Sequence, residues 1–118
     1  MIAEDDPAIL ELLAPVLEGE GYRVRRTADG AAALAQLAAE RADLLLTDNM
    51  MPRLSGLALI DRVPARSGPP LPIILLSAVT PQPLPAAPTI FVQKPFDLDA
   101  LIGLVRQLLH EEPSSHAP

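Results

Sequence analysis

The chain has 118 residues, no cysteine and a formal net charge of −6, and 49% of its residues are hydrophobic. This length fits one domain with a single core, and the lack of cysteine excludes disulfide bonds and thiolate metal sites. The negative charge disfavours direct binding to nucleic acid. No apolar run approaches the ~20 residues of a membrane helix, so we expect no membrane insertion and a cytoplasmic location.

Strand patterns and helix patterns alternate along the chain. Short apolar runs predict strands at residues 1–3, 22–27, 43–47, 71–78 and 90–93. Three arginines in the second of these runs are typical of an edge strand. The third and fourth runs are apolar without interruption, which predicts burial on both faces.

Four helices are expected among these strands. Asp6, Asp29 and Asp97 each precede an apolar periodic segment and are placed to cap its helix. We expect helices from residue 7 to Gly19 or Gly21, from 31 to 40, from 56 to 63, and from 98 to the end of the domain. Pro15 is expected to kink the first helix, because it removes a hydrogen bond. The alternation predicts a doubly wound α/β sheet.

The segment between the fourth and fifth strands is rich in proline. Residues 79–88 include Pro81, Pro83, Pro85 and Pro88. Since each proline inside a helix costs about 3 kcal/mol, we expect an extended crossover here and no helix. Residues 111–118 are expected to form a disordered tail.

Residues with charged or hydroxyl side chains stand at the ends of four predicted strands. Glu4 and Asp5 follow the first strand and Asp48 the third, while Ser77 and Lys94 follow the fourth and fifth. The carboxyl ends of parallel strands meet at one crevice, so these side chains should lie together. Three clustered carboxylates repel one another unless a divalent cation lies among them, and oxygen-rich sites suit Mg²⁺. The pattern therefore predicts a phosphoryl site.

In these features the chain resembles a response regulator receiver domain, the phosphoacceptor module of two-component signalling. The resemblance covers residues 1 to 110, and its pieces follow the family's order: residues 4–7, 28–30, Asp48 with 51–52 and Gly56, 77–78, and 94–96. It implies a flavodoxin-like sheet of five parallel strands in the order 2-1-3-4-5, with the fourth helix of the family lost. In the family a few more apolar residues precede the first strand, so we expect that strand to be cut short at its start.

The resemblance also implies roles for individual residues. Asp48 would be the phosphoacceptor, and Mg²⁺ or Mn²⁺ would be held by Asp5, by Asp48, by the backbone carbonyl of Met50 and by Glu4 through water. Lys94 would pair with the acceptor carboxylate and then with a phosphate oxygen.

Two further residues would form the switch. Ser77 would move toward the phosphoryl group, and Phe91 occupies the aromatic position that the family couples to this movement. The Lys94–Pro95 peptide bond would be cis.

Some of these residues could instead have a purely structural role. Asp48 could be a solubilising acid at a strand end, and the acids at residues 4–6 could cap the first helix. Ser77 could be an ordinary strand-end hydroxyl whose hydrogen bonds are satisfied.

At the level of function we expect a stand-alone receiver that takes a phosphoryl group from a histidine kinase or phosphotransfer protein and acts on a downstream protein. It would catalyse only its own phosphorylation and dephosphorylation, and we do not expect an enzyme. The alternative is a degenerate pseudo-receiver, an interaction module without switching. A haloacid-dehalogenase-like phosphatase is disfavoured, because Met50 stands where that class has a second aspartate. We also expect a partner chain or a homodimer at the flank left open by the missing helix.

Overall fold

The structure is a computed structural model, and it describes residues 1–80 and 88–110. One parallel sheet runs through the molecule in the order β2-β1-β3-β4-β5. Its strands are β1 (Ile2–Ala3), β2 (Arg26–Thr27), β3 (Leu45–Asp48), β4 (Ile73–Ser77) and β5 (Thr89–Gln93). The predicted α/β fold and strand order are therefore confirmed.

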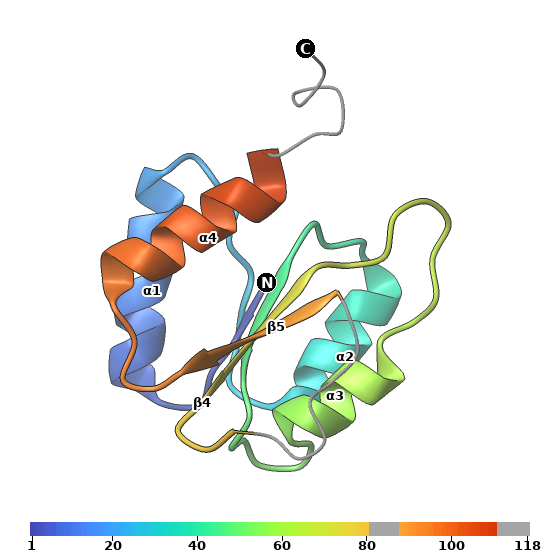
Figure 1. Ribbon diagram of the computed structural model, residues 1–118. Coiled ribbons are helices and arrows are strands. Elements are labelled where there is room, and N and C mark those ends of the chain that lie inside the picture. The colour runs from blue at the N-terminus through green and yellow to red at the C-terminus, as the bar shows by residue number, and fades with distance from the viewer. Residues whose placement is uncertain (81–87, 111–118) are drawn as a thin grey trace.

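Four helices flank the sheet among the described residues, namely α1 (Pro7–Gly19), α2 (Gly30–Ala39), α3 (Gly56–Arg62) and α4 (Leu98–His110). Figure 1 shows α1 and α4 on one side of the sheet and α2 and α3 on the other. The predicted caps are confirmed: Asp6 accepts from the N–H of Ala8, Asp29 from that of Ala32 and Asp97 from that of Ala100. The helix α1 continues through Pro15.

The second strand is much shorter than predicted. We expected a strand over residues 22–27, but only Arg26–Thr27 is one. The reason is that its neighbour β1 has only two residues, so most of residues 22–25 have no strand beside them. The edge position predicted for this strand is confirmed.

Two other expectations fall on parts of the chain that the structure leaves undescribed. The extended crossover predicted for the proline-rich segment concerns chiefly residues 81–87, and the predicted tail is residues 111–118. Both stay predictions. Within the described residues, no helix is long and apolar enough to cross a membrane.

The core has two layers, one on each face of the sheet. Between the sheet and helices α1 and α4 lie buried residues that include Ile2, Leu46, Ile74 and Val105. The opposite layer, toward α2 and α3, includes Ala3, Leu45 and Leu59. Every residue of β3 and β4 is buried, as their unbroken apolar runs predicted. The ends of these two strands are thus held firmly by packing on both sides.

A close backbone approach joins α2 to the loop between β3 and α3. A Cβ atom at Gly30 would lie 2.1 Å from the carbonyl oxygen of Leu54. In the same loop Arg53 has a φ of 69°, and its guanidinium lies 3.0 Å from the carboxylate of Asp29. Only glycine fits at position 30 without movement of the loop that follows Asp48.

Gly30→Ala should therefore destabilise the protein by about 1–3 kcal/mol, the range seen when a packed site is overfilled. Gly103→Ala is the matched control, since a Cβ there meets nothing within 4 Å and Gly103 lies inside α4. That change should stabilise by up to about 1 kcal/mol through helix propensity. Thermal melts of both variants check this. Equal effects of the two substitutions on the melting temperature would show that the Gly30 contact is not tight.

Candidate functional site

Asp48 lies at the carboxyl end of β3, in the middle of the sheet. It is paired with Leu76 of β4, and the next residue, Asn49, donates its N–H to the carbonyl of Leu76 at 3.1 Å. A Cβ at Gly56 would lie 2.4 Å from the carbonyl oxygen of Asp48, so α3 begins directly against this strand end. The backbone of Asp48 is thereby fixed from two sides, while 5% of the residue remains accessible.

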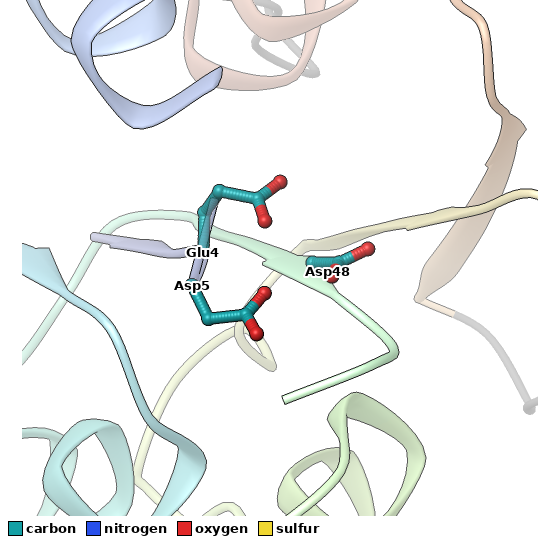
Figure 2. A group of neighbouring side chains, drawn as sticks. All are labelled: Glu4, Asp5 and Asp48. Atoms are coloured by element: carbon teal, nitrogen blue, oxygen red, sulfur yellow. The ribbon is translucent and has the colours of Figure 1, made fainter. Parts of the chain in front are cut away.

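Glu4 and Asp5 follow β1 and meet Asp48 at the same edge of the sheet. One carboxylate oxygen from each of the three residues lies within 4.8 Å of the others. Figure 2 shows the two acids that follow β1 and the one that ends β3 gathered at neighbouring strand ends. Glu4 and Asp48 are buried, whereas Asp5 is exposed. The predicted convergence of the three carboxylates is thus present.

Lys94 reaches this cluster from the end of β5. Its N–H donates to the carbonyl of Ser77 at 2.8 Å, which sets it beside the end of β4, and its bond to Pro95 is cis, as predicted. The Nζ atom lies 2.9 Å from Oδ1 of Asp48 and 3.2 Å from Oε1 of Glu4. Burial alone lowers the pKa of Lys94, but the bond to Asp48 and the charges of both acids outweigh burial and raise that pKa. The lysine is therefore held in its charged form.

Glu4 is fully enclosed and uses both of its oxygens. Oε1 binds Lys94, and Oε2 accepts the N–H of Asp6 at 3.1 Å. Burial raises the pKa of Glu4, the N–H of Asp6 lowers it, the charge of Asp48 raises it and Lys94 lowers it, with a net rise. Glu4 thus bonds both to the backbone just before α1 and to the side chain of Lys94.

The hydroxyl of Ser77 is engaged by its own turn. It donates to the carbonyl of Val79 at 2.8 Å and accepts the N–H of the same residue at 3.2 Å. Phe91, the other predicted switch residue, is half-buried in β5 and paired with Leu75. Their roles in switching stay predictions, as does the metal contact of the Met50 carbonyl.

Two positions at the site are open to solvent. Met50, two residues after Asp48, is 75% exposed. Val79, two residues after Ser77, is 73% exposed. Large apolar residues with this exposure stand out in a molecule whose core is otherwise well covered.

Several supporting residues were not anticipated. Ser55 caps α3 by accepting the N–H of Ala58, and the side chain of Asn49 accepts the N–H of Leu57. A serine directly before a helix is a signal that could have identified the first. The contact of Arg53 with Asp29 joins residues 24 apart in sequence and left no local signal.

The donor set fits a hard divalent cation. All three side chains offer oxygen atoms, which are the ligands that Mg²⁺ prefers, and one of the three faces solvent. The single ammonium of Lys94 offsets only part of the negative charge of the three carboxylates. An ion of the size and charge of Mg²⁺ or Mn²⁺ suits this group of acids.

Known proteins share this sequence pattern. A family model for the response regulator receiver domain matches residues 1–106. The chain is 37% identical over 114 residues to the response regulator MprA of Mycobacterium ulcerans, with 92% of this chain and 49% of MprA covered. It is 33% identical over 116 residues to the nitrogen assimilation regulatory protein NtrX of Azorhizobium caulinodans, with 92% and 25% covered. The chain thus spans a quarter to a half of the length of these two relatives.

Solved structures agree with the sequence comparison. The receiver domain of the hybrid histidine kinase CckA superposes with a TM-score of 0.79 at 29% identity, covering 92% of this chain and 95% of that one. The receiver domain of the sensor histidine kinase PA1611 from Pseudomonas aeruginosa, which has a magnesium ion coordinated in its active site cleft, gives a TM-score of 0.79 at 27% identity, with 92% and 93% covered. Because the family model matches most of its length, the chain belongs to the response regulator receiver domain family.

Proposed function

We propose that this receiver domain accepts a phosphoryl group on Asp48 from a histidine kinase or phosphotransfer protein. The observation that carries the proposal is the contact of Asp48 with Lys94 at 2.9 Å beside Glu4 and Asp5. The magnesium ion in the similar PA1611 receiver supports an ion among these acids. The same proposal includes a downstream protein target, a cytoplasmic location and a self-dimer through the flank of β4 and β5.

The chemistry assigned to the chain is a nucleophilic displacement at phosphorus. An Oδ atom of Asp48 forms a bond to the phosphorus of a phosphohistidine while the bond from phosphorus to the imidazole nitrogen breaks. The imidazole leaves with the electron pair, and the product is an acyl phosphate on Asp48. Lys94 stays beside the carboxylate and offsets the negative charge that arrives with the phosphoryl oxygens.

A bound Mg²⁺ or Mn²⁺ would be held by Asp5, Asp48 and the backbone carbonyl of Met50, with Glu4 through water, and would spread the charge on the phosphoryl oxygens. The described contacts of Glu4 fit an indirect role, because both of its oxygens already bind protein groups. Asp5 is exposed and is thus the more accessible ligand. In this proposal the protein catalyses only its own phosphorylation and dephosphorylation.

Asp48→Asn should abolish phosphorylation, because an amide oxygen is a poor nucleophile. Intact mass after incubation with Mg²⁺ and acetyl phosphate should show one added phosphoryl group on the parent chain and none on the variant. Asp61→Asn removes the same charge from the exposed surface of α3 and should label like the parent. Equal labelling of all three proteins would contradict the assignment, and no labelling of any would favour the pseudo-receiver.

Asp5→Ala should abolish Mg²⁺-dependent phosphorylation and leave the fold intact. Removing one carboxylate from a group whose oxygens lie within 4.8 Å relieves repulsion. Without metal, thermal melts should therefore show the variant to be at least as stable as the parent. A clear fall in melting temperature would instead make Asp5 a structural residue.

The acyl phosphate should decay slowly in this chain. Met50 and Val79 are exposed beside the site, and neither side chain offers a strong hydrogen-bonding group to orient a water for attack on phosphorus. Met50→Asn combined with Val79→Glu should speed the loss of the phosphoryl mass several-fold. Leu12→Asn on α1, another exposed apolar residue, is the control and should leave the rate unchanged. If the double variant decays no faster than the parent, apolar screening does not set the lifetime.

A further inference from the structure

The loop between β3 and α3 carries the carbonyl of Met50, which the proposed function makes a metal ligand. Hydrogen bonds within the loop fix its two ends. The N–H of Gly56 donates to the carbonyl of Asn49 at 2.9 Å, and the side chain of Asn49 accepts the N–H of Leu57 at 3.1 Å. These bonds close the loop at its base. The position of its middle, residues 50–54, depends on other contacts.

A strained turn lies in the middle of this loop. The N–H of Leu54 donates to the carbonyl of Pro52 at 2.7 Å, which closes a three-residue turn around Arg53. Arg53 has a φ of 69°, and within the described part of the chain it is the one residue other than glycine with a positive φ. Three-residue turns with this φ at their centre are rare and strained. Such a conformation persists only where the surrounding structure determines it.

Two contacts with α2 hold the turn in place. Nη1 of Arg53 donates to Oδ2 of Asp29 at 3.0 Å. The carbonyl of Leu54 lies against Gly30, where a Cβ would come within 2.1 Å of the carbonyl oxygen. The side chain of Leu54 also packs against the core layer of α2 and α3. The turn is therefore held by charge at residue 53 and by packing at residue 54.

Asp29 is a firm anchor for the arginine. Its Oδ1 atom accepts the N–H of Ala32 at 2.7 Å as the N-cap of α2, which leaves Oδ2 for Arg53. The side chain of Asp29 is 18% exposed, whereas that of Arg53 is 74% exposed. Because the helix already fixes the aspartate, the ion pair positions the loop and not the helix.

The size of the ion pair decides what it can control. An ion pair with one well-exposed partner contributes little to the stability of the whole domain. Its contribution is nevertheless of the same order as the strain of a single residue with an unfavourable φ. Loss of the contact between Arg53 and Asp29 should therefore change the population of the strained turn much more than the melting temperature of the protein.

We propose that Arg53 is a positioning residue for the divalent cation. Its ion pair with Asp29 holds the turn at residues 52–54, and this turn sets the position of the backbone at Met50. A guanidinium carries a positive charge and is not itself a ligand, so Arg53 acts through the backbone. This role rests on the proposed function, in which the carbonyl of Met50 is one of the groups that hold Mg²⁺ or Mn²⁺.

Binding of Mn²⁺ alone, measured by calorimetry without a phosphodonor, tests the proposal. Arg53→Ala should weaken binding about threefold to tenfold, at or below the low end of the loss seen when a group bonded to a metal ligand is removed. Arg53→Lys keeps a cation at this position and should restore most of the affinity. Arg106→Ala is the matched control, because it removes another exposed arginine from a contact with a carboxylate, that of Glu20. It should bind Mn²⁺ like the parent.

Melting temperatures measured without metal separate positioning from a general structural role. Arg53→Ala and Arg106→Ala should both melt close to the parent, since each loses one exposed ion pair. A large fall for Arg53→Ala alone would make Arg53 a structural residue and overturn the proposal.

A double-mutant cycle shows whether the effect passes through the ion pair. Asp29→Asn keeps a side-chain oxygen that can cap α2 and removes the charge. It should weaken Mn²⁺ binding in the parent chain and add little in the Arg53→Ala chain, because the two residues act as one unit. An equal effect of Asp29→Asn in both chains would overturn the proposal.

Phosphorylation of the same variants distinguishes this role from the proposed function. With acetyl phosphate, Arg53→Ala should need more Mg²⁺ for half-maximal labelling but should reach the rate of the parent at saturating Mg²⁺, since Asp48 and Lys94 are unchanged. If the parent binds Mn²⁺ and is labelled, an affinity of Arg53→Ala within about twofold of the parent overturns the role of Arg53 alone. A parent that binds Mn²⁺ without being labelled would overturn the proposed function alone, and a parent that binds no Mn²⁺ would overturn both.

Discussion

The arrangement of this domain depends on holding three carboxylates together at one edge of a sheet. Like charges at this distance repel, and the protein offsets part of the repulsion with one half-buried ammonium, that of Lys94. Lys94 contacts Asp48 and Glu4 at once, so it joins the end of β5 to the ends of β3 and β1. Lys94 and Glu4 are 90 residues apart in sequence, and their contact depends on the order of the strands from β1 to β5. Removing Lys94 would leave the buried carboxylates of Glu4 and Asp48 without this cation beside them.

The core layers on the two faces of the sheet hold this edge in place. The strands β3 and β4 are covered on both faces, which fixes the positions from which Asp48 and Ser77 project. Gly56 and Gly30 let neighbouring backbone come closer than a Cβ would allow, and both contacts bear on the segment from Asp48 to Leu54. Rigid elements thus support the acids, while the exposed Met50 and Val79 lie just after the ends of β3 and β4.

Much of this could be predicted from the sequence, because the relevant signals were local. The caps at Asp6, Asp29 and Asp97 and the apolar runs of β3 and β4 depend on neighbouring residues. The convergence of Glu4, Asp5 and Asp48 followed from the parallel order of the strands. The length of β2 could not be predicted, because the pattern of residues 22–27 does not reveal how few residues of β1 lie beside it. The second bond of Glu4 and the contact of Arg53 with Asp29 depend on three-dimensional proximity for which the pattern gave no signal.

The chain has no tryptophan and a single tyrosine, Tyr22, which precedes β2 and packs against the core layer under α1 and α4. Its ring lies at the amino-terminal end of the sheet, whereas the acids lie at the carboxyl-terminal end. Tyrosine emission from this protein therefore originates at the amino-terminal end of the sheet. It is an optical reporter of that end of the molecule, at the opposite end of the sheet from Asp48.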